Sequence, residues 1–135
     1  MKRLVSISYS SAAFNFAMLL LRIGSGVLIM KHGFDKLTRF ADMKTKFINF
    51  MGLGSTVSLS LTIFAEFFCG IFILIGLFTR IVTIPLIINL SVALFVAHKG
   101  DVFGDGERAA LFLTCFFTIL FCGPGKISVD KLMTR

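Results

Sequence analysis

The stretch VSLSLTIFAEFFCGIFILIGLFTRIVTIPLIINLSVALFVA, residues 57–97, decides the fold of this chain. It holds two apolar runs, 57–78 and 81–97, which are separated only by Thr79 and Arg80. Each run approaches the ~20 residues that a helix needs to cross the hydrocarbon layer of a membrane. A two-residue connection makes consecutive helices antiparallel, so the stretch predicts a transmembrane hairpin. Pro85 lies in the first turns of the second run, where it disrupts a helix little.

Two further apolar runs, 12–30 and 109–122, lie on either side of this hairpin. The first is too long for the apolar region of a secretory signal and no small-residue cleavage site follows it, so we expect a retained span. Four crossings place both termini on one side of the membrane. We therefore predict one domain, residues 1–135, that is all-α: an integral membrane antiparallel four-helix bundle.

Composition agrees with a membrane protein, because 56% of the 135 residues are apolar and they occur in blocks rather than in helical stripes. The formal charge of +7 is carried almost entirely outside the spans. That placement suits contact with anionic lipid head groups and leaves no basic face for nucleic acid, which we do not expect as a partner.

The loop between the first two spans shows a helical pattern of its own. Apolar residues recur at helical spacing from Phe40 to Met51, with charged and amide side chains between them. This pattern predicts a short amphipathic helix that lies along the membrane interface until Gly52 and Gly54 break it.

The distribution of basic residues does not settle the orientation. Lysine and arginine number six on the side of the termini and seven on the other side. If part of the basic first loop serves function, discounting it favours cytoplasmic termini, and dual insertion stays open.

Three polar residues lie near the middle of spans, where an isolated charge costs a few kcal/mol. Counted from the face with the long loops, Arg22 is eight residues from Met30, Glu66 nine from Val57 and Asn89 eight from Ala97. At 1.5 Å per residue all three reach a depth of about 12 to 14 Å. We therefore expect an ion pair between Arg22 and Glu66, with Asn89 satisfying the remaining hydrogen-bonding groups.

Two interpretations of this group stay open. The pair can fix helix register alone, as buried polar residues do in some proteins, or it can line a pocket for a ligand or a proton. Snorkelling of Arg22 to the interface is a third, weaker interpretation.

A second polar cluster is expected at the face with the long loops, where His32, Lys36, His98 and Glu107 come together. Histidine titrates near neutrality, so these residues suit proton exchange or contact with a ligand head group, although each is also an ordinary interfacial residue. No helical pair of metal ligands is present, and Cys69, Cys115 and Cys122 show no Cys-x-x-Cys spacing, so we predict no metal site. The role of the three cysteines stays open.

The chain resembles the DoxX family of small four-helix bacterial membrane proteins, on motifs spread over nearly its whole length. A proline is common shortly before span two in that family, whereas this chain has Gly54-Ser55. The motifs are Arg22 with Gly26, His32-Gly33-Phe34-Asp35-Lys36-Leu37, Ala65-Glu66 with Gly70, Gly76-Leu77-Phe78-Thr79-Arg80, Gly106-Glu107, and residues 123–130 (GPGKISVD).

The resemblance implies a protein of the bacterial cytoplasmic membrane that is associated with quinone-linked or thiol/sulfur-linked redox complexes. We expect an accessory membrane subunit with no cofactor of its own, holding a quinone-like or other small polar-headed ligand. Any redox cofactor belongs to a partner, and a homo-oligomer stays open. A non-catalytic lipid-binding or assembly protein is the main alternative. A small transporter is a weaker one, because the chain shows no inverted repeat.

Overall fold

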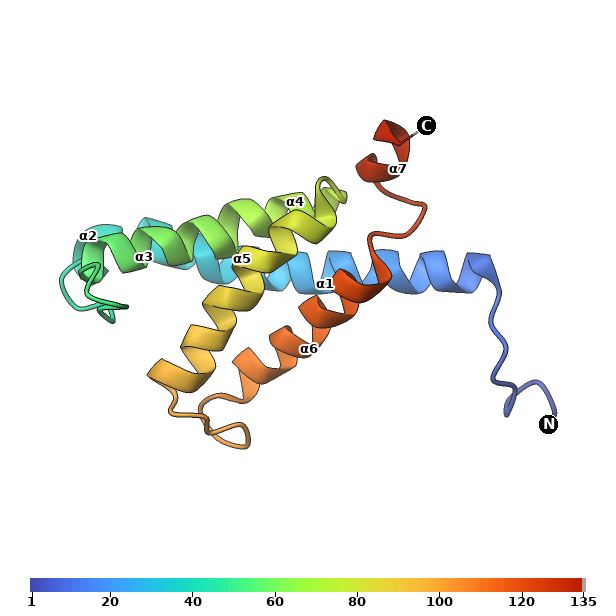
Figure 1. The fold of residues 1–135 in the computed structure, drawn as a ribbon, viewed down its shortest axis with the longest axis horizontal. Coiled ribbons are helices and arrows are strands. Elements are labelled where there is room, and N and C mark those ends of the chain that lie inside the picture. The colour runs from blue at the N-terminus through green and yellow to red at the C-terminus, as the bar shows by residue number, and fades with distance from the viewer. Residues whose placement is uncertain (135) are drawn as a thin grey trace.

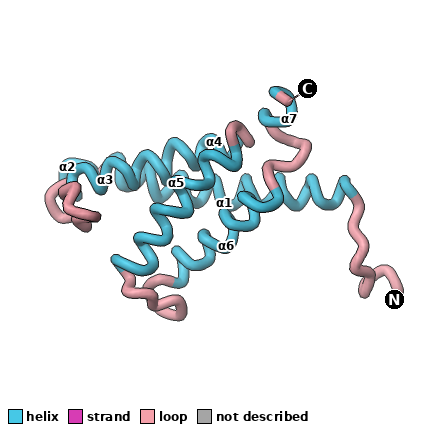
Figure 2. Tube along the Cα trace, viewed as in Figure 1, coloured by secondary structure: helices cyan, strands magenta, loops and turns pink. Residues whose placement is uncertain are grey.

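In the computed structural model, which describes residues 1–134, every regular element is helical. Figure 2 shows the loops only at the ends of these helices. The elements are α1 Ser11–Thr38, α2 Phe40–Met43, α3 Ser55–Ile63, η1 Phe64–Cys69, α4 Gly70–Ile75, α5 Thr79–Val92, η2 Ala93–Ala97, α6 Glu107–Cys122 and α7 Val129–Met133, where η marks a π-helical segment.

In the described part of the chain, three continuous helices are long and apolar enough to cross a membrane. They are α1, the run Ser55–Ile75 made by α3, η1 and α4, and the run Thr79–Ala97 made by α5 and η2. The predicted hairpin is present, with Gly76 ending α4 at a φ of 75°. Helix α6 has 16 residues, fewer than a straight crossing requires.

The first helix differs from the prediction. It does not end at Met30 but continues for eight more residues to Thr38. Gly33 is the one glycine in that extension. The positive charge of Lys36, in the last turn, interacts favourably with the negative C-terminal end of the helix dipole. The motif from His32 to Leu37 is therefore helical rather than a loop.

The loop helix also differs from the prediction, because only Phe40–Met43 is helical and residues 44–54 form turns and coil. The backbone carbonyl of Lys44 instead accepts hydrogen bonds from the hydroxyls of Ser55 and Thr56, at 2.6 and 3.2 Å. Phe50 N donates to Ser58 Oγ at 3.0 Å. These contacts fold the loop back onto the start of α3.

Helix α1 runs antiparallel to the second long helix, and the two lie close together at glycines. An added Cβ on Gly26 would lie 3.2 Å from the carbonyl oxygen of Gly70, and one on Gly33 would lie 2.5 Å from Phe67 N. Small residues allow such close approach of helix backbones in membrane proteins. Figure 1 shows the pair lying lengthwise, with α5 and α6 crossing it.

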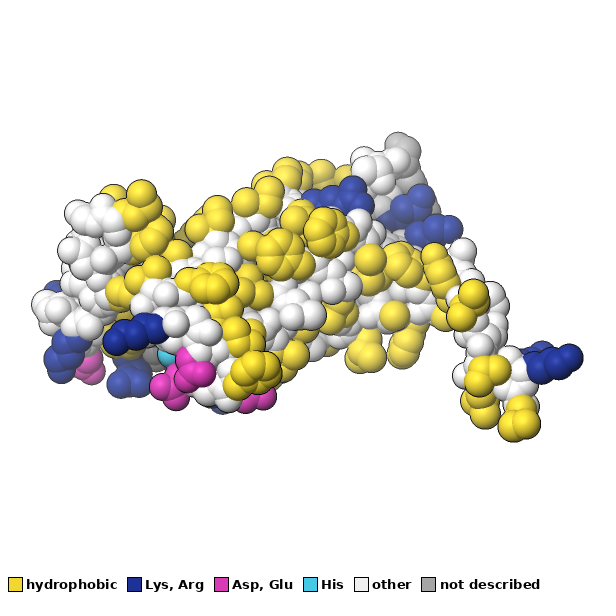
Figure 3. All heavy atoms as spheres, turned by 60° about the horizontal axis from the view of Figure 1, so that its bottom comes forward, with side chains coloured by type: hydrophobic (Ala, Val, Ile, Leu, Met, Phe, Trp, Pro, Cys, Tyr) yellow, Lys and Arg dark blue, Asp and Glu magenta, His cyan; other side chains and the backbone are white. Residues whose placement is uncertain are grey.

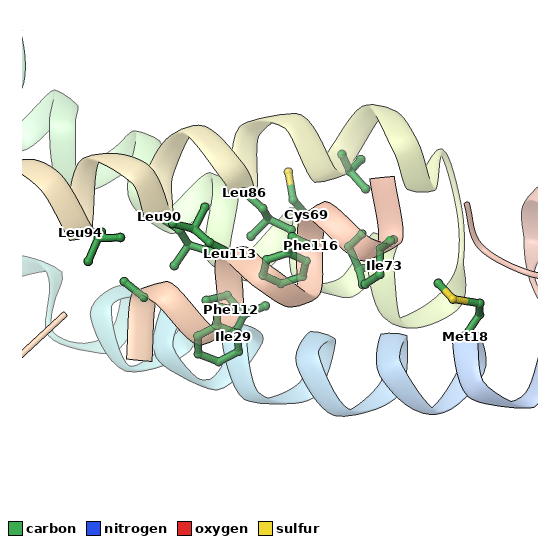
Figure 4. Packing of buried hydrophobic residues seen from close by; sticks show 13 residues of the cluster. Met18, Ile29, Cys69, Ile73, Leu86, Leu90, Leu94, Phe112, Leu113 and Phe116 are labelled. Atoms are coloured by element: carbon green, nitrogen blue, oxygen red, sulfur yellow. The ribbon is translucent and has the colours of Figure 1, made fainter. Parts of the chain in front are cut away.

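Helix α6 packs against both α5 and α1, so the four long helical segments share one apolar core. Figure 4 shows Leu86 and Leu90 of α5 facing Leu113 and Phe116 of α6. Side chains from η1, α4 and α1 complete this core, among them Cys69, Ile73, Met18 and Ile29.

The segment after α6 folds back over the hairpin between α4 and α5. The carboxylate of Asp130 accepts hydrogen bonds from Phe78 N at 2.7 Å and Thr79 N at 2.9 Å, which caps the start of α5. Asp130 N donates to the carbonyl of Gly76 at 2.9 Å. Both ends of the chain therefore lie towards the hairpin end of the molecule, as Figure 1 shows.

Candidate functional site

The site is built around Glu66, whose side chain is buried within η1 with 6% of the residue exposed. A π-helical turn carries an extra residue and is often found at functional sites. The other π-helical segment, Ala93–Ala97, contributes Ala93 and Ala97 to the wall of the same cavity. The two irregular turns thus face one space.

Both oxygens of Glu66 are hydrogen-bonded, and by residues from two other helices. Lys36 Nζ of α1 donates to Oε2 at 2.6 Å, and Asn89 Nδ2 of α5 donates to Oε1 at 3.2 Å. The lysine neutralises the carboxylate, which would otherwise carry the full cost of a buried charge. The structure therefore brings Lys36, Glu66 and Asn89 together as one cluster.

The predicted ion pair between Arg22 and Glu66 is wrong. Among residues 1–134 the salt bridge of Glu66 is formed with Lys36. Arg22, only 1% exposed, donates from Nη2 to the carbonyl of Ile127. The prediction takes Met30 as the end of the helix, but α1 ends at Thr38, two turns further on.

Helix register explains which residue each cation meets. Gly33 packs against the backbone of Glu66 and Phe67, while the Arg22 guanidinium lies against Gly76, ten residues along the second helix. Along α1, Arg22 and Gly33 are about 16 Å apart. Lys36 lies one turn after Gly33, so its ammonium group is close enough to pair with the carboxylate of Glu66.

Arg22 belongs to a second polar cluster, at the hairpin end of the molecule. Asp130 acts on its guanidinium electrostatically, and a Cβ added to Gly76 would clash with Nη1. Within residues 1–134, Nε and Nη1 of Arg22 have no hydrogen-bond partner, nor has the buried Oγ1 of Thr79. This cluster ties the C-terminal segment to α1 and the hairpin, and Arg22 does not line the cavity at Glu66.

A cavity of about 930 Å³ opens beside Glu66 at the end with the long loops. Its volume falls in the range of small-molecule sites, roughly 300–1,000 Å³. The structure places all the remaining predicted site residues on its wall, in a set that comprises His32, Lys36, Glu66, Asn89, His98 and Glu107. Figure 3 shows a histidine between basic and acidic side chains towards this end of the molecule.

The charges on the cavity wall balance. Lys36, Lys46 and Arg108 line the cavity together with Glu66, Asp105 and Glu107, three cations and three carboxylates. A charged ligand head would leave a net charge in the cavity, whereas a neutral head with hydrogen-bond acceptors would not. The arrangement therefore favours an uncharged polar head group.

Sequence reasoning missed the role of two loop residues, Phe47 and Ile48, which also line the cavity. It assigned them to an interfacial helix, and the folding back of that loop depends on contacts with Ser55 and Thr56 that the pattern does not reveal. The Lys36 contact had a visible signal, because Ile29, His32, Gly33 and Lys36 recur at helical spacing.

The cysteines lie apart from this site. Cys69 is buried in the core, Cys115 is half-buried and Cys122 is exposed, and none of them lines the cavity. Within residues 1–134 no three His, Cys, Asp or Glu side chains come together as a metal site.

A family model, DoxX, matches residues 17–99, which include Lys36, Glu66, Asn89 and both histidines. The chain belongs to the DoxX family. The resemblance based on the motifs is thereby confirmed. No curated protein and no solved structure matches the chain significantly.

Family membership and the three apolar helices together make this chain an integral membrane protein in contact with the lipid bilayer. DoxX proteins are loosely linked to membrane redox or thiol-oxidase roles. On the face in Figure 3, charged side chains gather towards the two ends and hydrophobic ones lie between them, as a spanning protein requires.

Proposed function

We propose that this DoxX protein is a small membrane subunit of a quinone-linked or thiol/sulfur-linked redox system, and that it holds a quinone-like ligand head in the cavity at Glu66. One observation carries the proposal: a partly buried, hydrogen-bonded Lys36–Glu66–Asn89 cluster lines a cavity whose wall also includes two histidines. Intramembrane ionisable residues that face a cavity are typical of ligand and proton pathways.

The residues on the wall suit such a head group chemically. Lys36 and Asn89 already donate to Glu66, and their remaining N–H groups can donate to carbonyl oxygens of a ligand. Glu66 accepts hydrogen bonds and can hold a proton. His32 and His98, nearer the loops, can pass that proton to and from water through their ring nitrogens. A bound quinone would supply two-electron, two-proton chemistry, with the electrons coming from a partner oxidoreductase.

The arrangement in the membrane is part of the proposal. Helix α6 shares the core of the three long helices and acts as the fourth crossing, which completes an antiparallel four-helix bundle. The protein resides in the bacterial cytoplasmic membrane with cytoplasmic termini, beside its redox partner.

The experiment compares Glu66→Gln with Asp42→Asn in lipid nanodiscs. Both variants convert one carboxylate to an amide, but Asp42 is exposed on α2 and lies outside the cavity. Binding of a benzoquinone with one isoprene unit is measured by calorimetry. We expect Glu66→Gln to weaken binding at least ~10-fold, about 1.4 kcal/mol, and Asp42→Asn to leave it unchanged.

The main alternative is a non-catalytic lipid-binding or assembly protein in which the same cluster only sets helix register. It is favoured by the cluster itself, because Lys36, Glu66 and Asn89 join three helices. Unchanged quinone binding in Glu66→Gln, together with a lower unfolding midpoint, would support this alternative. Failure of the wild-type protein to bind the quinone would overturn the ligand proposal.

A further inference from the structure

A second, smaller cavity lies beside the first and differs from it in chemistry. It measures about 260 Å³ and is bounded by α3, η1, α5 and the folded-back loop. Its wall is mostly apolar, with Phe50, Leu61, Phe64, Pro85 and Ile88 among the side chains that form it. Among residues 1–134, no ionisable side chain lines it.

Two of the three polar side chains on this wall, Ser58 and Asn89, are hydrogen-bonded. Ser58 Oγ donates to the carbonyl of Gly54 at 2.7 Å and accepts from Phe50 N at 3.0 Å. Asn89 directs Nδ2 to Glu66, on the side of the larger cavity. The small cavity therefore offers a ligand apolar contact and little hydrogen bonding.

The two cavities are adjacent and share part of their lining. Phe47, Ile48, Thr62, Asn89 and Val92 line both of them. The shared residues thus lie between the larger cavity, whose charged side chains balance, and the small cavity, whose wall is mostly apolar.

The small cavity also opens towards the lipid. Leu61, Phe64 and Ile88 lie on its rim and are about half exposed, at 52, 50 and 56%. These residues belong to helices that span the membrane, so their exposed surface faces hydrocarbon.

We propose that the small cavity holds the hydrocarbon chain of a membrane amphiphile whose compact, neutral head occupies the larger cavity. The inference rests on the proposed function for the head group and adds the chain subsite and the route of entry. At about 260 Å³ the subsite is smaller than a typical ligand pocket of ~300 Å³ or more, so it accepts part of one chain rather than two. The ligand enters sideways from the bilayer, between α3 and α5.

The first test fills the subsite with an indole ring. Leu61→Trp and Ile88→Trp narrow it from opposite helices, and Leu20→Trp is the matched control, because Leu20 is 62% exposed on α1 and lines neither cavity. Each variant is titrated in nanodiscs with a benzoquinone that has no chain and with one that carries three isoprene units. A chain-bearing ligand partitions into lipid, so its affinity is compared between variants rather than with the chainless ligand.

We expect Leu61→Trp and Ile88→Trp to weaken binding of the chain-bearing ligand at least ~10-fold and to leave the chainless ligand unaffected, while Leu20→Trp changes neither. If both ligands bind all variants equally, the chain subsite is wrong and the head-group site stands. If the chainless ligand does not bind the wild-type protein at all, the proposed function itself fails.

A second measurement does not depend on substitution and separates the two sources of such a chain. The wild-type protein is photolabelled with a quinone or with a diacyl phospholipid, each carrying a diazirine on its chain, and the labelled residues are mapped by mass spectrometry. We expect the quinone label to concentrate on residues 58–65 and 85–92 and the phospholipid label to spread over all lipid-facing helices. A phospholipid label concentrated there would overturn the neutral head, and an even spread of both labels would overturn the subsite.

Discussion

Glu66 and Arg22 are both buried charges of membrane-spanning helices, and each is stabilised in a different way. Glu66 has an ion pair with Lys36 and an amide hydrogen bond from Asn89. The guanidinium of Arg22 donates a hydrogen bond to a backbone carbonyl and interacts electrostatically with Asp130, whose carboxylate caps α5. The first cluster faces a cavity and the second holds the chain together, so function is expected at Glu66 and stability at Arg22.

At the scale of one residue, Lys36→Met tests the ion pair. It removes the cation and leaves the carboxylate of Glu66 uncompensated, which we expect to lower the free energy of unfolding by about 1–3 kcal/mol. The double variant Lys36→Met with Glu66→Gln leaves no charge and should recover most of that loss. Circular dichroism during unfolding in mixed detergent and dodecyl sulfate measures both.

Lys44→Met is the control for Lys36→Met, because it removes the same charge from an exposed loop position. We expect it to change stability by less than ~0.5 kcal/mol. Equal effects of Lys36→Met and Lys44→Met would show that the ion pair contributes nothing to stability.

At the scale of elements, the contact between α1 and η1 fixes the register of the two helices and so places Lys36 beside Glu66. Gly33 is the residue at this contact, and the atoms nearest to its added Cβ belong to the backbone of η1 rather than to a flexible side chain. Backbone cannot give way as a side chain can, so the two helices stay in register only while residue 33 lacks a Cβ.

We predict that Gly33→Ala destabilises the protein by about 1–3 kcal/mol and also weakens quinone binding, because α1 must move away from Glu66. Gly24→Ala is the matched control on the same helix, where an added Cβ meets nothing within 4 Å. There the gain in helix propensity should stabilise the protein by up to ~1 kcal/mol. Unfolding midpoints and calorimetry distinguish the two, and a tolerated Gly33→Ala would contradict the close packing.

At the scale of the whole molecule, the helices place the termini and residues 76–78 at one end, and the loops 44–54 and 98–106 at the other. Helix α6 joins the two ends even though it has only 16 residues. The proposed crossing of α6 would make the number of spans even.

We predict a labelling pattern for single cysteines introduced into a variant without Cys69, Cys115 and Cys122. Thr45→Cys and Val102→Cys should react with an impermeant maleimide from one side of the membrane. Ser8→Cys and Lys126→Cys should react from the other. If Val102→Cys and Lys126→Cys react from the same side, α6 does not cross. An insertion in both orientations would make all four react from both sides.

Several features were predictable because their physical cause is local. The hairpin follows from two long apolar runs with two residues between them, and the helical state of each run follows from the need to satisfy every backbone group in hydrocarbon. The bounds predicted for the apolar runs after the first, such as 81–97 against Thr79–Ala97, differ from those of the observed helices by three residues or fewer. The grouping of His32, His98 and Glu107 at one end follows from the order of the spans alone.

The sequence by itself therefore determined the membrane class, the hairpin and the family, since apolar run length and motif spacing can be read without knowing any contact. Only the tertiary structure decided that Lys36, and not Arg22, meets Glu66. That choice depends on where α1 ends and on how Gly33 and Gly26 set its register against the second helix. Both are contacts between residues far apart in the chain, and a shift of about four turns along a helix leaves the apolar pattern unchanged while it exchanges one cation for another.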